Sequence, residues 1–414
     1  MTTSTKPATS TTRVAGATTA LILLTALNFV NYIDRYILPG VQEMVKGEFH
    51  TSDAEIGSLT TWFMLAYICA APITGWLGDR FPRKPLVVFG AIFWSSMNLL
   101  SATVHTFGAL NLRHAALGLG EASFGIFAPA ILSDFFPAQE RNRVMTIFNL
   151  AIPVGAALGY LIGGMVGSHW GWRAPFYVSA VPGILFALMI LFLMREPERG
   201  ASEVEKAKVG KADLLALVSN RAYLSSIFGY AFITFCMGGL SWWMPSFLHR
   251  VNGYSLGQAG FTIGAITAVT GIVGTATGGW IASRLLKRNS SALYLVSAFG
   301  CLASIPFALL TFFGPSWITL PSLAGAEICL FLGTGPINAA TVNAVTAANR
   351  ASALAGQLLL IHLLGDMPSP LVIGMVSDRS NLRLGMGITT LALAVAGVIL
   401  LAGGRFVKRN PVAA

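Results

Sequence analysis

Apolar runs of about 20 residues recur along the whole chain, and this repetition restricts the fold more than any other feature. Each run is long enough to cross a hydrocarbon core of ~30 Å as a helix. Only 11% of the 414 residues are charged, whereas soluble domains carry roughly 25%, so lipid must solvate most of the surface. Alternating ten-residue strand patterns, which are typical of outer-membrane barrels, are absent from the sequence. The sequence therefore predicts an all-α membrane protein.

The apolar runs predict twelve transmembrane helices in two six-helix, pseudo-symmetric halves. Their approximate ranges are 17–41, 54–77, 84–104, 107–135, 142–166, 174–194, 222–249, 257–285, 291–313, 317–345, 351–377 and 384–405. A polar stretch in the middle of the chain indicates a linker between the halves. The predicted division is an N-terminal tail at 1–13, a first half at 14–195, a cytoplasmic linker at 196–220, a second half at 221–406 and a C-terminal tail at 407–414.

The net charge of +10 does not indicate nucleic-acid binding, because the basic residues gather in short clusters between the apolar runs. Loops on the cytoplasmic side of membrane proteins carry such an excess of Lys and Arg. Placing both termini in the cytoplasm puts 20 of the 27 Lys and Arg residues on that side. The expected location is the bacterial inner membrane. The four cysteines lie inside apolar runs without metal-site spacing, so neither a disulfide framework nor a metal is expected.

The two halves share a sequence repeat. Gly75-Trp76-Leu77-Gly78-Asp79-Arg80-Phe81-Pro82-Arg83-Lys84 follows the second run, and Gly279-Trp280-Ile281-Ala282-Ser283-Arg284-Leu285-Leu286-Lys287-Arg288 follows the eighth. Both segments read Gly-Trp-aliphatic-small-x-Arg-x-x-basic-basic. Parallel six-helix repeats are an architecture of transporters that work by alternating access.

The segment from Gly75 to Lys84 resembles the signature loop of the major facilitator superfamily, with Pro82 at a position where that family usually has glycine. A narrower resemblance is to the Spinster-like branch. The residues that carry it are Asn31-Tyr32-Ile33-Asp34-Arg35, Gly118-Leu119-Gly120-Glu121-Ala122-Ser123, Ile152-Pro153-Val154-Gly155 with Gly159-Tyr160, and His362-Leu363-Leu364-Gly365-Asp366-Met367-Pro368-Ser369-Pro370 with Ser377-Asp378-Arg379.

The Spinster-like resemblance implies a proton-coupled secondary active transporter of an amphiphilic anion, a lysophospholipid or a sphingoid-phosphate-like lipid. A proton symporter of small carboxylates or aromatic acids is the alternative, because such symporters show the Asn-Tyr-x-Asp-Arg segment too. The proton gradient would be the energy source, with no cofactor and with a monomer in membrane lipid as the working unit. No catalytic motif is present in the sequence, so an enzyme is disfavoured.

Ionisable residues inside apolar runs are the candidates for coupling, since a charge at the bilayer centre costs at least ~2.5–3.5 kcal/mol. Asp34, Glu121, His362 and Asp366 are predicted to handle protons. Burial disfavours the charged form of Glu121, and a nearby Arg35 would favour it. His362 and Asp366 are four residues apart and share a helix face. Structural roles are the competing interpretation, as an ion network for Asp34 and as support for a helix break for the His362–Asp366 pair.

The predicted substrate-binding residues come from both halves. They are Arg35, Tyr32, His114, Phe124, Tyr160, Glu327 and Trp242. His114 precedes Glu121 by seven residues, which leaves the two side chains only about 20° apart around a helix, whereas Arg113 lies about 80° away. His114 rather than Arg113 is therefore expected to share the face of Glu121.

A cytoplasmic gate is predicted around the signature loop, where ion pairs at the helix ends would hold the outward-facing state closed. Its residues are Gly75, Asp79, Arg80, Arg83, Lys84, Asp134 and Arg141. A separate glycine series, Gly155, Gly159 and Gly163, recurs every four residues and predicts close helix packing.

Overall fold

The computed structural model describes residues 13–198, 217–346 and 349–407. Most of the predicted linker and both predicted tails lie outside these ranges. The first half contains six helices: α1 (Ala17–Phe49), α2 (Asp53–Arg80), α3 (Arg83–Ser101), α4 (Phe107–Phe135), α5 (Ala138–Trp170) and α6 (Ala174–Leu193). Local sequence sets their ends. Ser52 and Glu55 form a capping box at the start of α2, and in the second half α8 (Arg221–Asn252) is followed by Gly253, whose φ of 75° is in the left-handed region.

The second half repeats this arrangement with two interrupted spans. Its helices are α8 (Arg221–Asn252), α9 (Leu256–Leu286), α10 (Ala292–Phe313), α11 (Thr319–Leu332), α12 (Thr334–Asn343), α13 (Arg350–Ile361), α14 (Ser369–Arg379) and α15 (Leu382–Gly404). The predicted helix at 317–345 is not continuous, because a short 3-10 turn precedes α11 and Gly333 separates α11 from α12. A π-turn at His362–Asp366 joins α13 to α14, just before Pro368 and Pro370, which have no N–H to donate.

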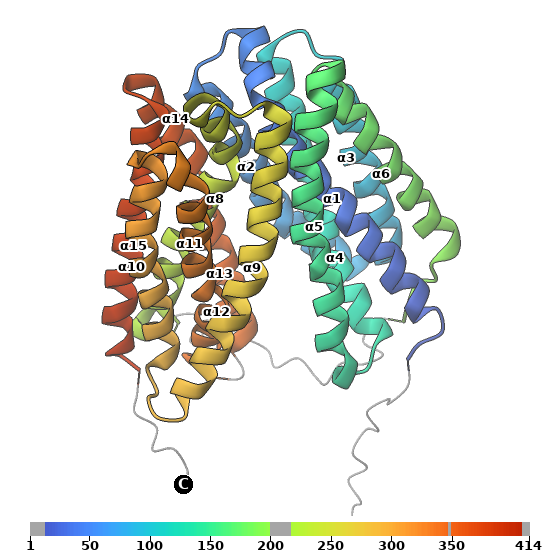
Figure 1. Cartoon of the computed structure of the whole chain (residues 1–414). Coiled ribbons are helices and arrows are strands. Elements are labelled where there is room, and N and C mark those ends of the chain that lie inside the picture. Colours follow the sequence, from blue (N-terminus) through green and yellow to red (C-terminus); the bar gives the residue numbers. More distant parts are fainter. Residues whose placement is uncertain (1–12, 199–216, 347–348, 408–414) are drawn as a thin grey trace, which may run out of the picture.

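The fold confirms the predicted class. Within the described residues, eleven segments are long and apolar enough to cross a membrane. The helix outside that set is α3, which packs against α4 and α6 as the remaining span of the first half. The start of α1 and the end of α15 lie at the same end of the bundle, at the bottom of Figure 1.

Helices α1 and α5 pack closely along the glycine series. A Cβ atom at Gly155, Gly159 or Gly163 would lie 2.8, 2.6 or 2.6 Å from the carbonyl oxygens of Phe29, Ile33 and Ile37, respectively. Only glycine permits this backbone approach. The predicted packing role of the series is therefore confirmed.

Replacing Gly159 by alanine is expected to lower stability by about 1–3 kcal/mol, because the added methyl must push α1 away from α5. A fall in the thermal unfolding midpoint of the purified protein would show it. Gly47→Ala is the matched control, since Gly47 lies in α1 with no atom within 4 Å of the added Cβ. Equal midpoints for the two variants would contradict the packing role.

The two halves meet along α5 with α9 and along α2 with α14. On α5 and α9, the contact runs from Ala157 and Gly264 to Gly164 and Leu256. Further hydrogen bonds between the halves, such as Gln42 Nε2 to Ser246 Oγ at 2.7 Å and Asp53 N to Asp378 Oδ1 at 2.8 Å, lie at the end opposite the start of α1. The halves are therefore joined at the upper end of Figure 1.

Candidate substrate cavity

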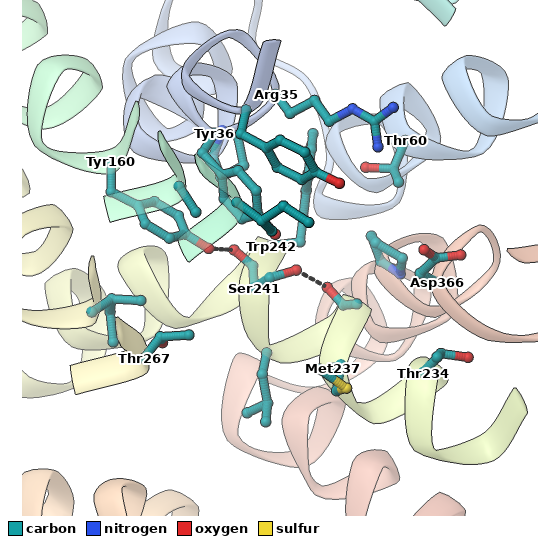
Figure 2. A pocket seen from close by; sticks show the side chains of 18 of the residues that line it. Arg35, Tyr36, Thr60, Tyr160, Thr234, Met237, Ser241, Trp242, Thr267 and Asp366 are labelled. Atoms are coloured by element: carbon teal, nitrogen blue, oxygen red, sulfur yellow. Dashed lines mark hydrogen bonds between the residues drawn. The ribbon is translucent and has the colours of Figure 1, made fainter. Parts of the chain in front are cut away.

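A cavity of about 440 Å³ lies between the halves, near the middle of the spans. Figure 2 shows Arg35, Tyr36 and Tyr160 from the first half near Ser241 and Trp242 of α8, with Thr267 and Asp366 on the other walls. Aromatic and aliphatic side chains supply most of the lining, including Phe63, Met64, Leu117, Ile152, Met237, Ile263, Leu330 and Phe331. The cavity can therefore hold a molecule with a sizeable apolar part.

Arg35 forms an ion pair with Glu121 at one wall of the cavity. The distance from Arg35 Nε to Glu121 Oε2 is 2.5 Å. The Glu121 side chain is completely buried, whereas 21% of the Arg35 side chain is exposed. The Arg35–Glu121 contact considered in the sequence analysis is thus formed, and a ligand in the cavity can reach Arg35 but not Glu121.

Three aromatic rings surround the guanidinium of Arg35. The centroids of Tyr32, Phe63 and Tyr67 lie 5.4, 5.2 and 5.5 Å from its Cζ atom. Such rings stabilise a cation through their π faces. Figure 2 shows the guanidinium extending toward Thr60 on α2. Arg35 is therefore held as a cation at the cavity wall, in a position to meet an anionic group.

Helix α4 directs His114 and Arg113 to different places. His114 is buried, lines the cavity and lies against Phe63, with ring centroids 5.3 Å apart. Arg113 instead donates to the carbonyl of Leu100 and to Thr103 Oγ1 at the end of α3. The prediction that His114, rather than Arg113, lies on the Glu121 side of the helix agrees with this geometry.

Asp34 points into the first half instead of into the cavity. Its Oδ1 atom accepts a hydrogen bond from Asn98 Nδ2 at 2.7 Å, and that amide also donates to Ser179 Oγ at 2.9 Å. The residue is 2% exposed and does not line the cavity. Its proton-handling role stays a prediction, and its hydrogen-bonded neighbours are an uncharged amide on α3 and a hydroxyl on α6 rather than members of an ion network with α4.

Phe124 was expected to contact substrate, and the structure contradicts this. Its ring lies between Trp94 and Phe148, with centroid distances of 5.6 and 6.1 Å, and it is 2% exposed. Phe124 lies seven residues, about two turns, beyond the cavity-lining Leu117 on nearly the same face of α4, at a level of the helix where α3 and α5 cover it. It belongs to the core of the first half.

The second half contributes a buried carboxylate, Glu327 of α11. Thr267 donates to its Oε1 atom at 2.9 Å, and Thr270 donates to its Oε2 atom at 2.6 Å. Glu327 and Thr267 both line the cavity. The two threonines are three residues apart on α9, a helical spacing from which a shared partner could have been inferred.

Tyr160 and Trp242 line the part of the cavity where α5 meets α8. The hydroxyl of Tyr160 donates to the carbonyl oxygen of Ser241, across the two halves. The ring of Tyr36 packs edge-on against Tyr160, with centroids 5.0 Å apart. Tyr36 and Tyr67 escaped the sequence analysis, because aromatic residues are common on lipid-facing and packed helix surfaces alike.

His362 and Asp366 contact each other on the π-turn. His362 Nδ1 lies 3.0 Å from Asp366 Oδ2, and both residues line the cavity. The centroid of Tyr67, a neighbour of Arg35, is 6.3 Å from the His362 ring. The expected contact is present and faces the cavity, and the proton-handling role of the pair stays a prediction.

The predicted gate residues make contacts within the first half. Arg83 Nη1 lies 2.9 Å from Asp134 Oδ2, Lys84 donates to the carbonyl of Met194, and Arg141 donates to that of Phe136. The guanidinium of Arg80 lies over the ring of Trp76.

Glu196, which the sequence analysis missed, accepts hydrogen bonds from the backbone N–H groups of Arg83 and Lys84 at 2.8 and 2.9 Å. Asp79 likewise has an interaction partner. Gly75 has open space beside it, because an added Cβ would meet no atom within 4 Å.

Comparison with known proteins decides the family. A family model described as Major Facilitator Superfamily matches residues 24–361. The chain belongs to this superfamily. Within it, the chain is 34% identical over 383 residues to Protein spinster homolog 1 of Xenopus tropicalis, covering 87% of this chain and 73% of that protein. It is also 34% identical over 380 residues to the Sphingosine-1-phosphate transporter SPNS2 of Danio rerio, covering 85% and 74%.

A solved structure supports the fold of this Spinster-like chain. The crystal structure of a bacterial homolog of the human lysosomal transporter Spinster, in an inward-facing and unoccupied conformation, superposes with a TM-score of 0.87. The match covers 96% of this chain and 99% of the other, at 23% sequence identity. The protein is thus an integral membrane transporter of the Spinster-like branch and not an enzyme.

Proposed function

We propose that this Spinster-like transporter couples proton movement to the transport of an amphiphilic anion, such as a lysophospholipid or a sphingoid phosphate, by alternating access. The observation that carries the proposal is the Arg35–Glu121 pair at the wall of a predominantly apolar cavity. Arg35 offers a charged anchor for an anionic head group. The surrounding aromatic and aliphatic side chains offer an environment for a hydrocarbon chain. The relative named as a sphingosine-1-phosphate transporter supports the same substrate class.

Coupling of proton and substrate would follow from competition between the substrate anion and Glu121 for Arg35. A buried carboxylate is costly when its counter-ion is lost, because the low-dielectric surroundings disfavour its charge. When a substrate anion takes Arg35, Glu121 is relieved of this cost by binding a proton. Anion and proton therefore occupy the cavity together. Release of either one favours re-formation of the Arg35–Glu121 pair and release of the other.

The remaining polar groups complete the proposed site. Glu327, His114 and Trp242 would contact the substrate from the other walls, and the His362–Asp366 pair would serve as a second proton-exchanging group. With both termini in the cytoplasm of a bacterial cell, the halves are joined on the periplasmic side. The working unit is proposed to be a monomer.

Uptake into proteoliposomes tests the substrate class. We expect the reconstituted protein to take up a radiolabelled single-chain lysophospholipid, and a tenfold excess of a small aromatic acid to leave this uptake unchanged. The apolar lining favours the lysolipid, because each buried CH₂ group contributes about 0.8 kcal/mol. Protein-free liposomes correct for spontaneous partitioning. Uptake of the small acid alone would contradict the proposed substrate class and favour an organic-anion symporter.

A further inference from the structure

A network of charged and polar groups joins the two halves at the end of the bundle opposite the start of α1. Its members are Glu43 and Lys46 of α1, Asp53 of α2, Arg250 of α8, and Ser377 and Asp378 of α14. None of these residues lines the substrate cavity. None belongs to the signature loop, which lies at the other end of α2. The network is therefore separate from both the site and the predicted gate.

Arg250 contacts two carboxylates of the other half at once. Its Nη1 and Nη2 atoms donate to Asp53 Oδ2 and Oδ1 at 2.8 and 2.9 Å. Its Nε atom donates to Glu43 Oε2 at 2.8 Å, and Nη2 lies 2.7 Å from Glu43 Oε1. Paired N–H groups on a planar guanidinium suit this two-point contact with each carboxylate. Separation of the halves would break all of these bonds together.

Asp378 makes the opposite connection, from the second half to the first. Its Oδ1 and Oδ2 atoms accept hydrogen bonds from the backbone N–H groups of Asp53 and Ala54, at 2.8 and 2.9 Å. These N–H groups belong to the first turn of α2, where no partner exists within the helix. A carboxylate there also interacts favourably with the helix dipole. One half thus caps a helix of the other.

The contact surface beneath the network is tightly packed. Ser377 donates to Asp53 Oδ2 at 2.6 Å, so the carboxylate of Asp53 is bound by two residues of the second half, Ser377 and Arg250. A Cβ atom at Gly374 of α14 would lie 2.4 Å from the carbonyl oxygen of Asp53, and one at Gly57 of α2 would lie 2.4 Å from that of Pro370. Water therefore has no room between α2 and α14 at these points.

We infer that Asp53, Arg250 and Asp378 form a latch that closes this side of the transporter and opens in each transport cycle. Alternating access requires the two halves to separate here when the site opens to this side of the membrane. The bonds of the latch exist only while this side is closed, so their strength sets the population of the open form. The inference depends on the transporter fold and not on the identity of the substrate.

Thiol labelling measures this opening. Ser246 of α8 is 1% exposed and accepts a hydrogen bond from Gln42 across the halves, so a Ser246→Cys substitution reports separation at this end. In lipid nanodiscs, a membrane-impermeant maleimide is expected to label this cysteine at least about tenfold faster when Asp378→Ala is added, because the change removes both charge-assisted bonds to the start of α2. The parent chain, which retains its four native cysteines, gives the background.

A matched pair of charge substitutions distinguishes a latch from general stabilisation of the first half. Arg250 binds Asp53 across the halves, whereas Lys46 binds Asp53 within the first half. Arg250→Gln is expected to accelerate labelling as Asp378→Ala does, and Lys46→Gln is expected to change it less than twofold. The inference is overturned if correctly folded Asp378→Ala and Arg250→Gln proteins label at the parental rate. It is equally overturned if Lys46→Gln accelerates labelling as much as Arg250→Gln.

Discussion

Replacing Glu121 by glutamine is expected to reduce uptake driven by a pH gradient to the background of protein-free liposomes. Glutamine has nearly the same shape as glutamate and its carbonyl can accept a hydrogen bond from Arg35, but it cannot bind and release a proton. Arg35 stays available to a substrate anion, so exchange of labelled for unlabelled substrate across the membrane is expected to continue. Uptake with and without a pH gradient, together with counter-exchange, measures the two activities separately.

Glu140→Gln provides the matched control for this change. Glu140 is a partly exposed carboxylate that pairs with Arg13 at 2.7 Å, at the start of α5 and outside the cavity. Its replacement is expected to leave gradient-driven uptake unchanged, because exposed ion pairs contribute only about 0–1 kcal/mol. Normal gradient-driven uptake by Glu121→Gln would show that another group carries the proton, with His362 and Asp366 as the next candidates.

Replacing Arg35 by alanine is also expected to have a large effect, weakening substrate binding at least ~100-fold. The change removes the cation that would hold the anionic head group, and it leaves Glu121 without its 2.5 Å partner. Loss of one member of a buried pair costs about 3–5 kcal/mol, unless the remaining carboxylate takes up a proton. Arg35→Lys is expected to recover only part of the affinity, because an ammonium group lacks the planar fork. Equilibrium binding of a lysophospholipid to the purified protein is the measurement.

Arg113→Gln separates the role of Arg35 from a general effect of removing positive charge. Arg113 lies on α4 with Glu121, but it binds the end of α3 outside the cavity. Its removal is expected to change substrate affinity less than threefold, in line with the small contribution of an exposed charge. Equal losses of affinity in Arg35→Ala and Arg113→Gln would contradict a specific anion site at Arg35.

Features that depend on one helix or on two helices in fixed register could be predicted from the sequence. The heptad-like spacing of His114 and Glu121 predicted that both lie on one side of α4, where Glu121 pairs with Arg35 and His114 lines the same cavity as Arg35. The glycine series predicted the close approach of α5 to α1. The spacing of His362 and Asp366 predicted their contact. In each case the fixed rotation and rise per residue of one helix determine which of its residues share a side, whatever the helix packs against.

Features that depend on the rotation of one helix against several others could not be predicted in this way. Asp34 faces the interior of the first half because α3 and α6 cover that side of α1, and Phe124 does so because α3 and α5 cover that side of α4. Single-helix geometry does not reveal these neighbours. The latch is a stronger example. Asp53 and Asp378 are 325 residues apart, and both are ordinary helix-end residues in the sequence. Only the docking of the two halves brings them together.

The most direct test of the central claim is proton movement triggered by substrate. Proteoliposomes that contain a pH-sensitive dye are given a lysophospholipid on the outside, with no initial pH gradient and with ion gradients collapsed. Co-transport of proton and anion predicts acidification of the interior that depends on the protein and disappears in Glu121→Gln. Protein-dependent uptake of the lysophospholipid without any change in interior pH would contradict proton coupling at the Arg35–Glu121 pair.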